Sequence, residues 1–69
     1  MKHNKYDFVK IVEVEDRYKE FLGQEGMIIE ADKGYELPFE VYFFDRNVQQ
    51  KSIDEGTLLW RGRELKKVV

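Results

Sequence analysis

The chain has few side chains that could act as a catalytic base or nucleophile. His3 is the only histidine, and it falls in the polar segment 1–6, which we expect to be frayed. A histidine base must be held within hydrogen-bond reach of its target, and a hydroxyl nucleophile needs an orienting base. Ser52 and Thr57 are the only residues of their types, and no internal histidine can serve them. The sequence therefore predicts a protein that is not an enzyme and has no catalytic residues.

Acidic residues gather at two places along the chain. Paired carboxylates can perform acid–base chemistry or bind cations. Here the stretch 54–56 is only a fragment of a calcium-binding loop, and the two glycines of 23–26 lack the Lys-Ser/Thr pair and the helix of a phosphate loop. The chain has no cysteine for a thiolate metal site or a disulfide. We expect solvated charges, no metal site and no cofactor-binding residues. The acidic residues concerned are Glu13, Glu15, Asp16, Asp54 and Glu55.

Length and composition indicate one small domain. The 69 residues are 42% hydrophobic and 14% aromatic, which is too apolar for disorder although 38% are charged. A chain of this length exposes much of its surface even when folded, so the core has to come from close side-chain packing. No apolar run is long enough to cross a bilayer, and residues 1–10 lack the pattern of a secretory signal. We expect a soluble, cytoplasmic monomer with no membrane partner.

Charge is distributed unevenly along the chain. The net charge is −2. Residues 1–10 carry a net +2 and residues 60–69 a net +3, which leaves −7 for the acidic middle. The fold therefore decides whether the two basic ends form one patch or two separate tails.

Five short segments have the composition of β-strands. The clearest is 39–44, where Phe39, Val41 and Phe43 alternate with polar or aromatic residues and are expected to face the core. Turn signals separate the segments at intervals of about 8–12 residues, which is typical of a small antiparallel barrel. The expected strands are 8–14, 26–32, 39–44, 57–60 and 66–69.

The connections are less regular than the strands. Residues 15–25 fit either one helical turn, from the spacing of Tyr18, Phe21 and Leu22, or a long extended excursion. Residues 45–47 are a turn signal. Residues 48–56 are expected to form a long hairpin loop with some strand character, and 61–65 a single helical turn or tight corner.

Within residues 22–32, two glycines flank the point where the expected strand begins. Glycine allows a positive φ and a close approach of another backbone. Gly23 and Gly26 are therefore expected to form a tight corner of the barrel that leads into the strand, and not a phosphate-binding loop.

Several short motifs together resemble the SH3-like barrel, and more narrowly bacterial SH3-like domains of the KOW type and of the ferredoxin–thioredoxin reductase variable chain. The resemblance implies a single all-β domain over 1–69, a five-stranded SH3-like antiparallel barrel with one short helical turn. The tyrosine-rich segment of eukaryotic signalling SH3 domains is missing, so proline-rich peptide binding is not expected. The motifs are Val9-Lys10-Ile11, Gly23-Gln24-Glu25-Gly26-Met27-Ile28, Val41-Tyr42-Phe43 and Arg63-Glu64-Leu65-Lys66-Lys67-Val68.

Surface aromatic residues predict a small non-enzymatic module that binds another protein. Tyr42 and Phe44 fall on the outer face of their strand, unless the segment 15–25 folds over and covers them. Trp60 fits either the core or an exposed contact. By analogy, such a module suits a bacterial or phage accessory protein that adapts or inhibits a larger machine. The expected contact residues are Tyr42, Phe44 and Trp60, with Tyr18 and Tyr35 at the rim.

The alternative function is RNA binding. In SH3-like barrels the first and last strands are neighbours, so the two basic ends could share one edge, with Trp60 free to stack on a base. KOW-type domains, which the chain resembles, often act on RNA or in transcription and translation. The competing interpretation is a solvated edge whose lysines discourage edge-to-edge pairing. The residues of this basic edge are Lys10, Arg61, Arg63, Lys66 and Lys67.

Overall fold

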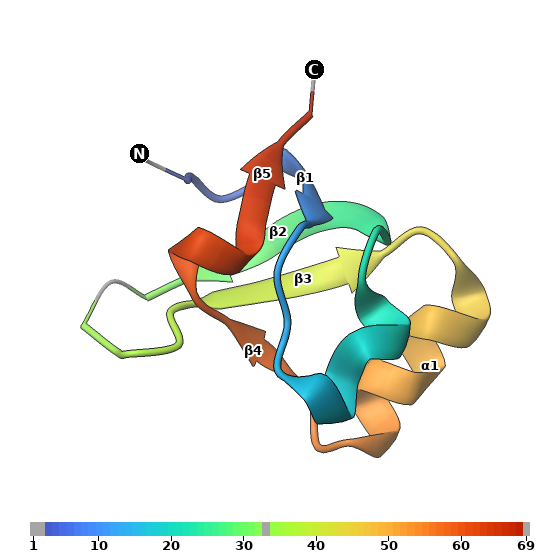
Figure 1. Ribbon diagram of the computed structural model, residues 1–69. Coiled ribbons are helices and arrows are strands. Elements are labelled where there is room, and N and C mark those ends of the chain that lie inside the picture. The colour runs from blue at the N-terminus through green and yellow to red at the C-terminus, as the bar shows by residue number, and fades with distance from the viewer. Residues whose placement is uncertain (1–2, 33, 69) are drawn as a thin grey trace.

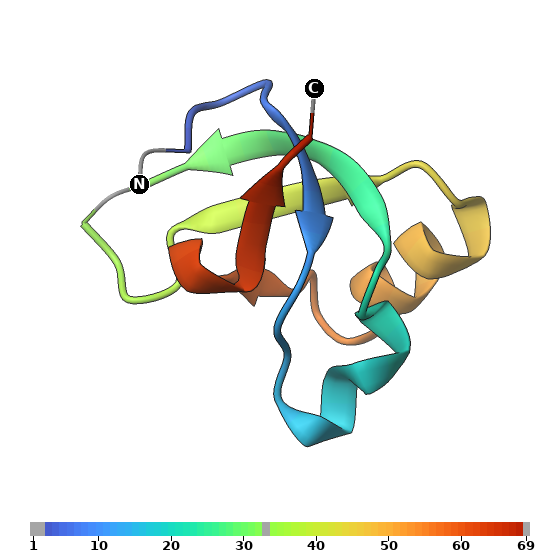
Figure 2. The same cartoon turned by 45° about the horizontal axis from the view of Figure 1, so that its top comes forward.

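The computed structural model describes residues 3–32 and 34–68, which form a five-stranded antiparallel sheet in the order β4-β3-β2-β1-β5 (Figure 1). The sheet curls into a half-barrel, which is compatible with an SH3-like fold (Figure 2). This confirms the prediction of a small all-β domain with five antiparallel strands. The strands are β1 (Phe8–Ile11), β2 (Glu25–Ala31), β3 (Phe39–Phe43), β4 (Leu59–Trp60) and β5 (Leu65–Lys67).

The order of the strands makes the first and the last described strand neighbours. β1 pairs with β2 on one side and with β5 on the other, where Lys10 lies opposite Lys66 and Ile11 opposite Leu65. The pairing of β2 with β3 shifts register between Ile28 and Glu30. An extra residue at such a bulge bends the strand and increases its twist, and this shift therefore helps β2 to curl around the core.

The two glycines near the start of β2 do what the sequence predicts. Gly23 has φ +84°, a conformation that most other residues avoid. Gly26 lies against β3 so closely that a Cβ atom would collide with the carbonyl oxygen of Tyr42. Gly23 thus makes the corner, and Gly26 allows β2 to pack against β3.

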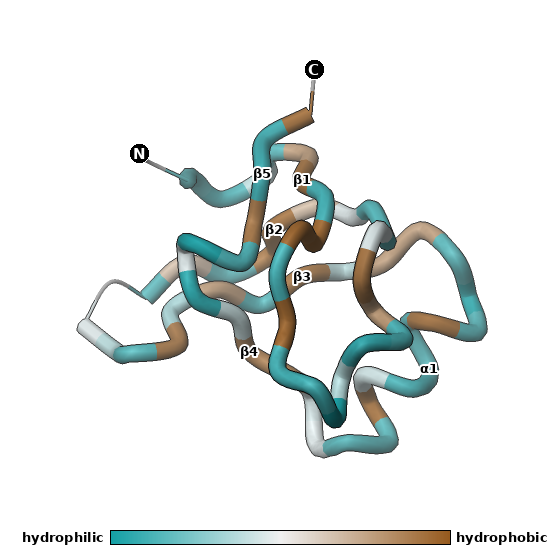
Figure 3. Tube along the Cα trace, viewed as in Figure 1, coloured by the Kyte–Doolittle hydropathy of each residue, from teal (hydrophilic) through white to brown (hydrophobic). Residues whose placement is uncertain are grey.

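Three aromatic side chains form the centre of the core. Phe21 has its ring centroid 5.5 Å from that of Phe43 and 5.6 Å from that of Trp60. Phe21 ends η1 (Asp16–Phe21), a 3-10 helix, so the segment 15–25 makes a helical turn and not an extended excursion. The predicted alternation in β3 is confirmed, because Phe39, Val41 and Phe43 are buried and Tyr42 is exposed. Figure 3 shows hydrophobic and hydrophilic segments alternating along the chain.

The connection between β3 and β4 differs from the prediction. Residues 45–56 were expected to form a turn and a hairpin loop, but Arg46–Asp54 is an α-helix, α1. Asp45 caps it, since its carboxylate accepts hydrogen bonds from the backbone N–H groups of Asn47 and Val48. Only Val48 and Ser52 of α1 are buried, so the helix has no apolar stripe of the usual width. Because the polar Ser52 occupies the inner face, the apolar residues of this segment do not recur with a helical period.

Ser52 also explains how the chain leaves α1. Its Oγ accepts a hydrogen bond of 3.2 Å from the backbone N–H of Leu58, and its carbonyl oxygen accepts one from Thr57. α1 lies beside η1, and Lys51 Nζ is 3.2 Å from Glu20 Oε1 across the two helices (Figure 1). The helix thus closes the end of the half-barrel that η1 begins to cover.

The N-terminal segment is a second correction. Residues 1–6 were expected to be frayed; residues 1 and 2 lie outside the described part, but His3 is only 2% exposed. Its Nε2 lies 3.0 Å from the carbonyl oxygen of Gly62, and its ring packs edge-on against Phe39. Gly62 belongs to η2 (Gly62–Glu64), which confirms the helical turn predicted for 61–65. His3 therefore serves as a packing residue at the corner between β4 and β5.

Candidate functional site

The outer face of the sheet carries a row of large side chains. Phe8 of β1 lies directly opposite Met27 of β2, and Met27 lies opposite Tyr42 of β3. Residues that face one another across antiparallel strands point to the same side of the sheet. The three side chains therefore form a continuous row across the middle of the sheet.

Phe44 extends this row into a cluster. It follows β3, two residues after Tyr42, and its ring lies edge-on to that of Phe8 with 5.7 Å between the ring centroids. One ring comes from β1 and the other from the residue that follows β3, and β2 lies between these two strands. Phe8 and Phe44 are each 51% exposed and Tyr42 is 46% exposed. We call Phe8, Met27, Tyr42 and Phe44 the outer-face cluster.

The segment 15–25 does not cover this cluster. Its buried side chain, Phe21, packs on Phe43 and Trp60 inside the half-barrel, whereas the cluster lies on the opposite face of β3. The alternative in which Tyr42 and Phe44 are covered by this segment is therefore wrong.

The other predicted contact residues do not join Tyr42 and Phe44. Trp60 is 2% exposed, so it offers too little surface to act as an aromatic contact for a partner protein or to stack on a base; its alternation with exposed Leu59 places it in the core. Tyr18 is half-buried at η1, and Tyr35 is exposed in the connection between β2 and β3. The five-residue patch expected from the sequence is thus divided among four places.

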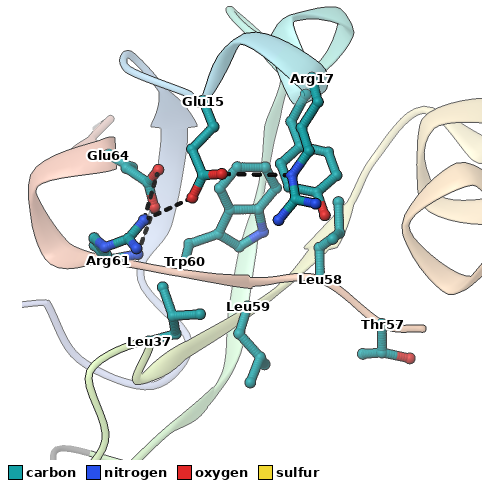
Figure 4. A pocket seen from close by; sticks show the side chains of 10 residues that line it. Glu15, Arg17, Leu37, Thr57, Leu58, Leu59, Trp60, Arg61 and Glu64 are labelled. Carbon is teal, nitrogen blue, oxygen red and sulfur yellow. Dashed lines mark hydrogen bonds and ion pairs between the residues drawn. The ribbon is translucent and has the colours of Figure 1, made fainter. Parts of the chain in front are cut away.

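A groove opens beside β4, between η1, the end of the β2–β3 connection and η2 (Figure 4). It has a volume of about 220 Å³, which is small compared with the ~300–1,000 Å³ of sites for drug-sized ligands. We call it the β4 groove. Its lining residues are Glu15, Arg17, Tyr18, Leu37, Thr57, Leu58, Leu59, Trp60, Arg61 and Glu64.

Ion pairs run along one wall of the β4 groove (Figure 4). Glu15 bridges two arginines, with Oε1 3.4 Å from Arg17 Nε and Oε2 3.3 Å from Arg61 Nη1. Glu64 is 5% exposed; it accepts a 2.7 Å hydrogen bond from the backbone N–H of Arg61 and lies 3.6 Å from its guanidinium. Both carboxylates of the wall are therefore already engaged.

Trp60 contributes a hydrogen-bond donor to this region. Its Nε1 is buried and has no acceptor within the described part of the chain. Most buried polar groups in native proteins have a partner. This nitrogen lies on the edge of the indole ring that is turned toward Leu58 (Figure 4).

The fold brings together the three lysines of the basic edge on β1 and β5, whereas Arg61 lines the β4 groove, and acidic residues compensate most of these charges. β1 and β5 are neighbours, as expected, and Lys10 faces Lys66. Four of the five residues have an acidic partner within 4.0 Å; among residues 3–32 and 34–68, Lys66 has none. The pairs are Lys10–Glu25, Arg61–Glu15, Arg61–Glu64, Arg63–Glu13 and Lys67–Asp7.

Some residues of both sites escaped the sequence analysis. Phe8 and Met27 join the outer-face cluster only through the register of β1, β2 and β3, although the outward direction of Phe8 follows from its alternation with Val9. Glu64 was counted only as a charge, yet it is a buried acceptor. Its position three residues after Arg61, which is the spacing of a capping box, is the sequence signal that could have identified it.

Three findings bear on other functions. Residues 3–32 and 34–68 contain no group of three or more His, Cys, Asp or Glu residues placed to hold a metal ion. Among the helices of this part of the chain, none has the length and apolar character that a membrane crossing requires. Comparison with models of protein families, with curated proteins and with solved structures gives no match.

Proposed function

We propose that this chain is a non-enzymatic protein-binding module that presents the outer-face cluster to a partner protein. The observation that carries the proposal is that three large aromatic side chains lie together on one face of the sheet, about half exposed. Contiguous exposed apolar residues on a small domain usually mark an interaction site. Aromatic residues and methionine are also enriched in protein–protein interfaces.

The charges around the cluster favour a protein partner over RNA. Four of the five basic-edge residues are compensated by carboxylates, and the chain is acidic overall, with a net charge of −2. RNA binding depends on uncompensated positive charge along the phosphate backbone. An apolar contact between proteins has no such requirement.

The SH3-like class gives the proposal its wider setting. We infer that the chain is related in architecture to the bacterial KOW-type and reductase variable-chain barrels, and that it acts as a cytoplasmic accessory protein of bacterial or phage origin that adapts or inhibits a larger assembly. The support is the strand order, the small size and a surface cluster in place of a deep cleft. Fold alone does not determine function, so the surface has to be tested directly.

The experiment is affinity capture from the source cell followed by mass spectrometry. The wild-type chain is compared with the double variant Phe8→Thr/Phe44→Thr, since threonine keeps β-propensity while removing both rings. Tyr35→Thr is the matched control, because Tyr35 is an exposed aromatic residue away from the cluster. Circular dichroism and urea unfolding confirm that all three proteins are folded.

We expect a partner that is captured by the wild type and by the Tyr35 variant but lost with the double variant. For the purified pair, the double variant should weaken binding by about tenfold or more, because truncating a central interface side chain costs more than ~1 kcal/mol. Equal capture by the wild type and the double variant would exclude the outer-face cluster as the binding surface.

A further inference from the structure

The β4 groove combines an apolar interior with polar groups along one wall. Leu37, Leu58, Leu59 and Trp60 line it, and the side chain of Leu59 points away from the indole of Trp60 (Figure 4). Leu59 is exposed, so part of this apolar surface faces solvent. The groove shares no residue with the outer-face cluster, and it can therefore be considered independently of the proposed function.

The hydrogen-bonding groups of the groove are mainly donors. An arginine guanidinium has five N–H donors and no acceptor, and Arg17 and Arg61 use only some of theirs in the contacts to Glu15 and Glu64. Trp60 adds a buried N–H without an acceptor. The two carboxylates of the wall, in contrast, are already ion-paired, because each oxygen of Glu15 lies near one arginine and Glu64 is held by Arg61.

This imbalance determines which ligand charge the groove favours. A cation would have to approach two guanidinium groups and compete with them for Glu15. An anion can be bound by the same guanidinium groups, whose planar forks suit carboxylates. Arg17 is exposed and can reorient toward a ligand.

We propose that the β4 groove binds a hydrophobic carboxylate, that is, an apolar group about the size of one large side chain that bears a single carboxylate. The apolar part contacts Leu37 and Leu58 beside the largely buried indole of Trp60, and the carboxylate pairs with Arg17 and Arg61. The volume of about 220 Å³ fits a group of this size. The same chemistry occurs in a free small organic acid and at the C-terminus of a protein that ends in an apolar residue.

The proposal predicts that the ligand affinity depends on Glu15 in a specific way. It occupies both arginines in the free protein, so it competes with the ligand carboxylate for them. Replacing Glu15 by glutamine removes this competitor and leaves the wall with a net positive charge. The ligand should therefore bind more tightly to Glu15→Gln than to the wild type, whereas a merely structural role of Glu15 predicts no such gain.

Trp60 allows binding to be followed without attaching a dye or another chemical probe to the groove. It is the only tryptophan, so its indole N–H gives a single resonance in a ¹⁵N–¹H correlation spectrum. The probes are 3-phenylpropanoate and its amide, and the peptide acetyl-Gly-Gly-Phe with a free or an amidated C-terminus. An apolar ligand of this size is expected to have a Kd on the order of 1–10 mM.

The supporting result is a saturable shift of the Trp60 N–H resonance with the acids and a weak or absent shift with the amides. Stronger binding of the free-acid peptide than of 3-phenylpropanoate supports a protein C-terminus, and the reverse supports a small acid. Glu15→Gln should bind the acid roughly two- to five-fold more tightly, and Arg17→Gln more weakly by a similar factor, as expected for exposed ion pairs. Lys66→Gln, on β5 and outside the groove lining, is the control and should leave the Kd unchanged.

The proposal is overturned by the absence of any saturable shift, by equal shifts with acids and amides, or by unchanged affinity in both Glu15→Gln and Arg17→Gln. Both substitutions are at exposed side chains, and circular dichroism checks their folding. If one variant does not fold, the other still provides the test.

Discussion

Glu64 holds Arg61 at the corner between β4 and β5 through two contacts. Its carboxylate accepts a 2.7 Å hydrogen bond from the backbone N–H of Arg61, and the guanidinium of Arg61 lies 3.6 Å away. Glu64 is buried within η2. A buried carboxylate is tolerated when its hydrogen bonds and charge are satisfied, and both requirements are met here by one residue three positions earlier.

Replacing Glu64 by alanine should therefore destabilise the protein by about 1–3 kcal/mol, because the Arg61 N–H loses its buried acceptor. Glu64→Gln keeps an acceptor oxygen at the same place and should cost less. Urea unfolding of the two variants measures the difference. Equal stability of Glu64→Ala and the wild type would show that this contact does not hold the corner.

Gly26 and Gly56 have different environments, so replacing each by alanine gives a matched comparison. Gly26→Ala should destabilise the fold by about 3 kcal/mol or more, since its Cβ would overlap the carbonyl oxygen of Tyr42 and separate β2 from β3. Gly56 has φ +86° but nothing within 4 Å of the position of a Cβ, so Gly56→Ala should cost only about 1 kcal/mol of backbone strain. Thermal or urea unfolding tests this order, and the reverse order would contradict it.

The cap of α1 offers a further test of stability. Asp45→Ala removes the acceptor for the N–H groups of Asn47 and Val48, and losses of this kind cost about 0.5–2 kcal/mol. Asp45→Asn retains a capping oxygen and should remain near the wild type. The midpoint of urea unfolding should fall for the alanine variant without a change in its slope.

RNA binding through the basic edge is expected to be absent. Lys10, Arg61, Arg63 and Lys67 are paired with carboxylates, so little charge remains for phosphates. The measurement is a titration with single-stranded and duplex RNA at ~0.01 M salt, where the Debye length is about 30 Å and attraction is least screened. Saturable binding whose affinity falls with salt at a slope of about −3.5 to −4.5, as for five phosphate contacts, would contradict this prediction.

The strands could be predicted because their side chains alternate, as in Phe39, Val41 and Phe43. α1 could not, because its inner face is made by Val48 and Ser52 and has no apolar period. His3 was assigned to a frayed end because its partners, Gly62 and Phe39, are distant in sequence. Contacts of this kind depend on the curled sheet as a whole and leave no local signal.

The candidate sites could likewise be predicted from the sequence only in part. Tyr42 and Phe44 point outward by alternation, and this direction could be read from the sequence. Phe8 and Met27 join them only through strand register, which depends on the Gly23 corner and the bulge in β2. The β4 groove collects residues from four separate segments, so its composition follows from topology and not from any one motif.

The pairing of β1 with β5 has a consequence for synthesis of the chain. β1 precedes the other described strands in the chain, and its second neighbour, β5, follows all of them. Until β5 is in place, the edge of β1 that β5 covers is open, and such edges can pair with other chains. Lys10 on β1 itself makes that edge less suitable for pairing, so the side chain that faces Lys66 in the finished sheet can protect the nascent chain before Lys66 exists.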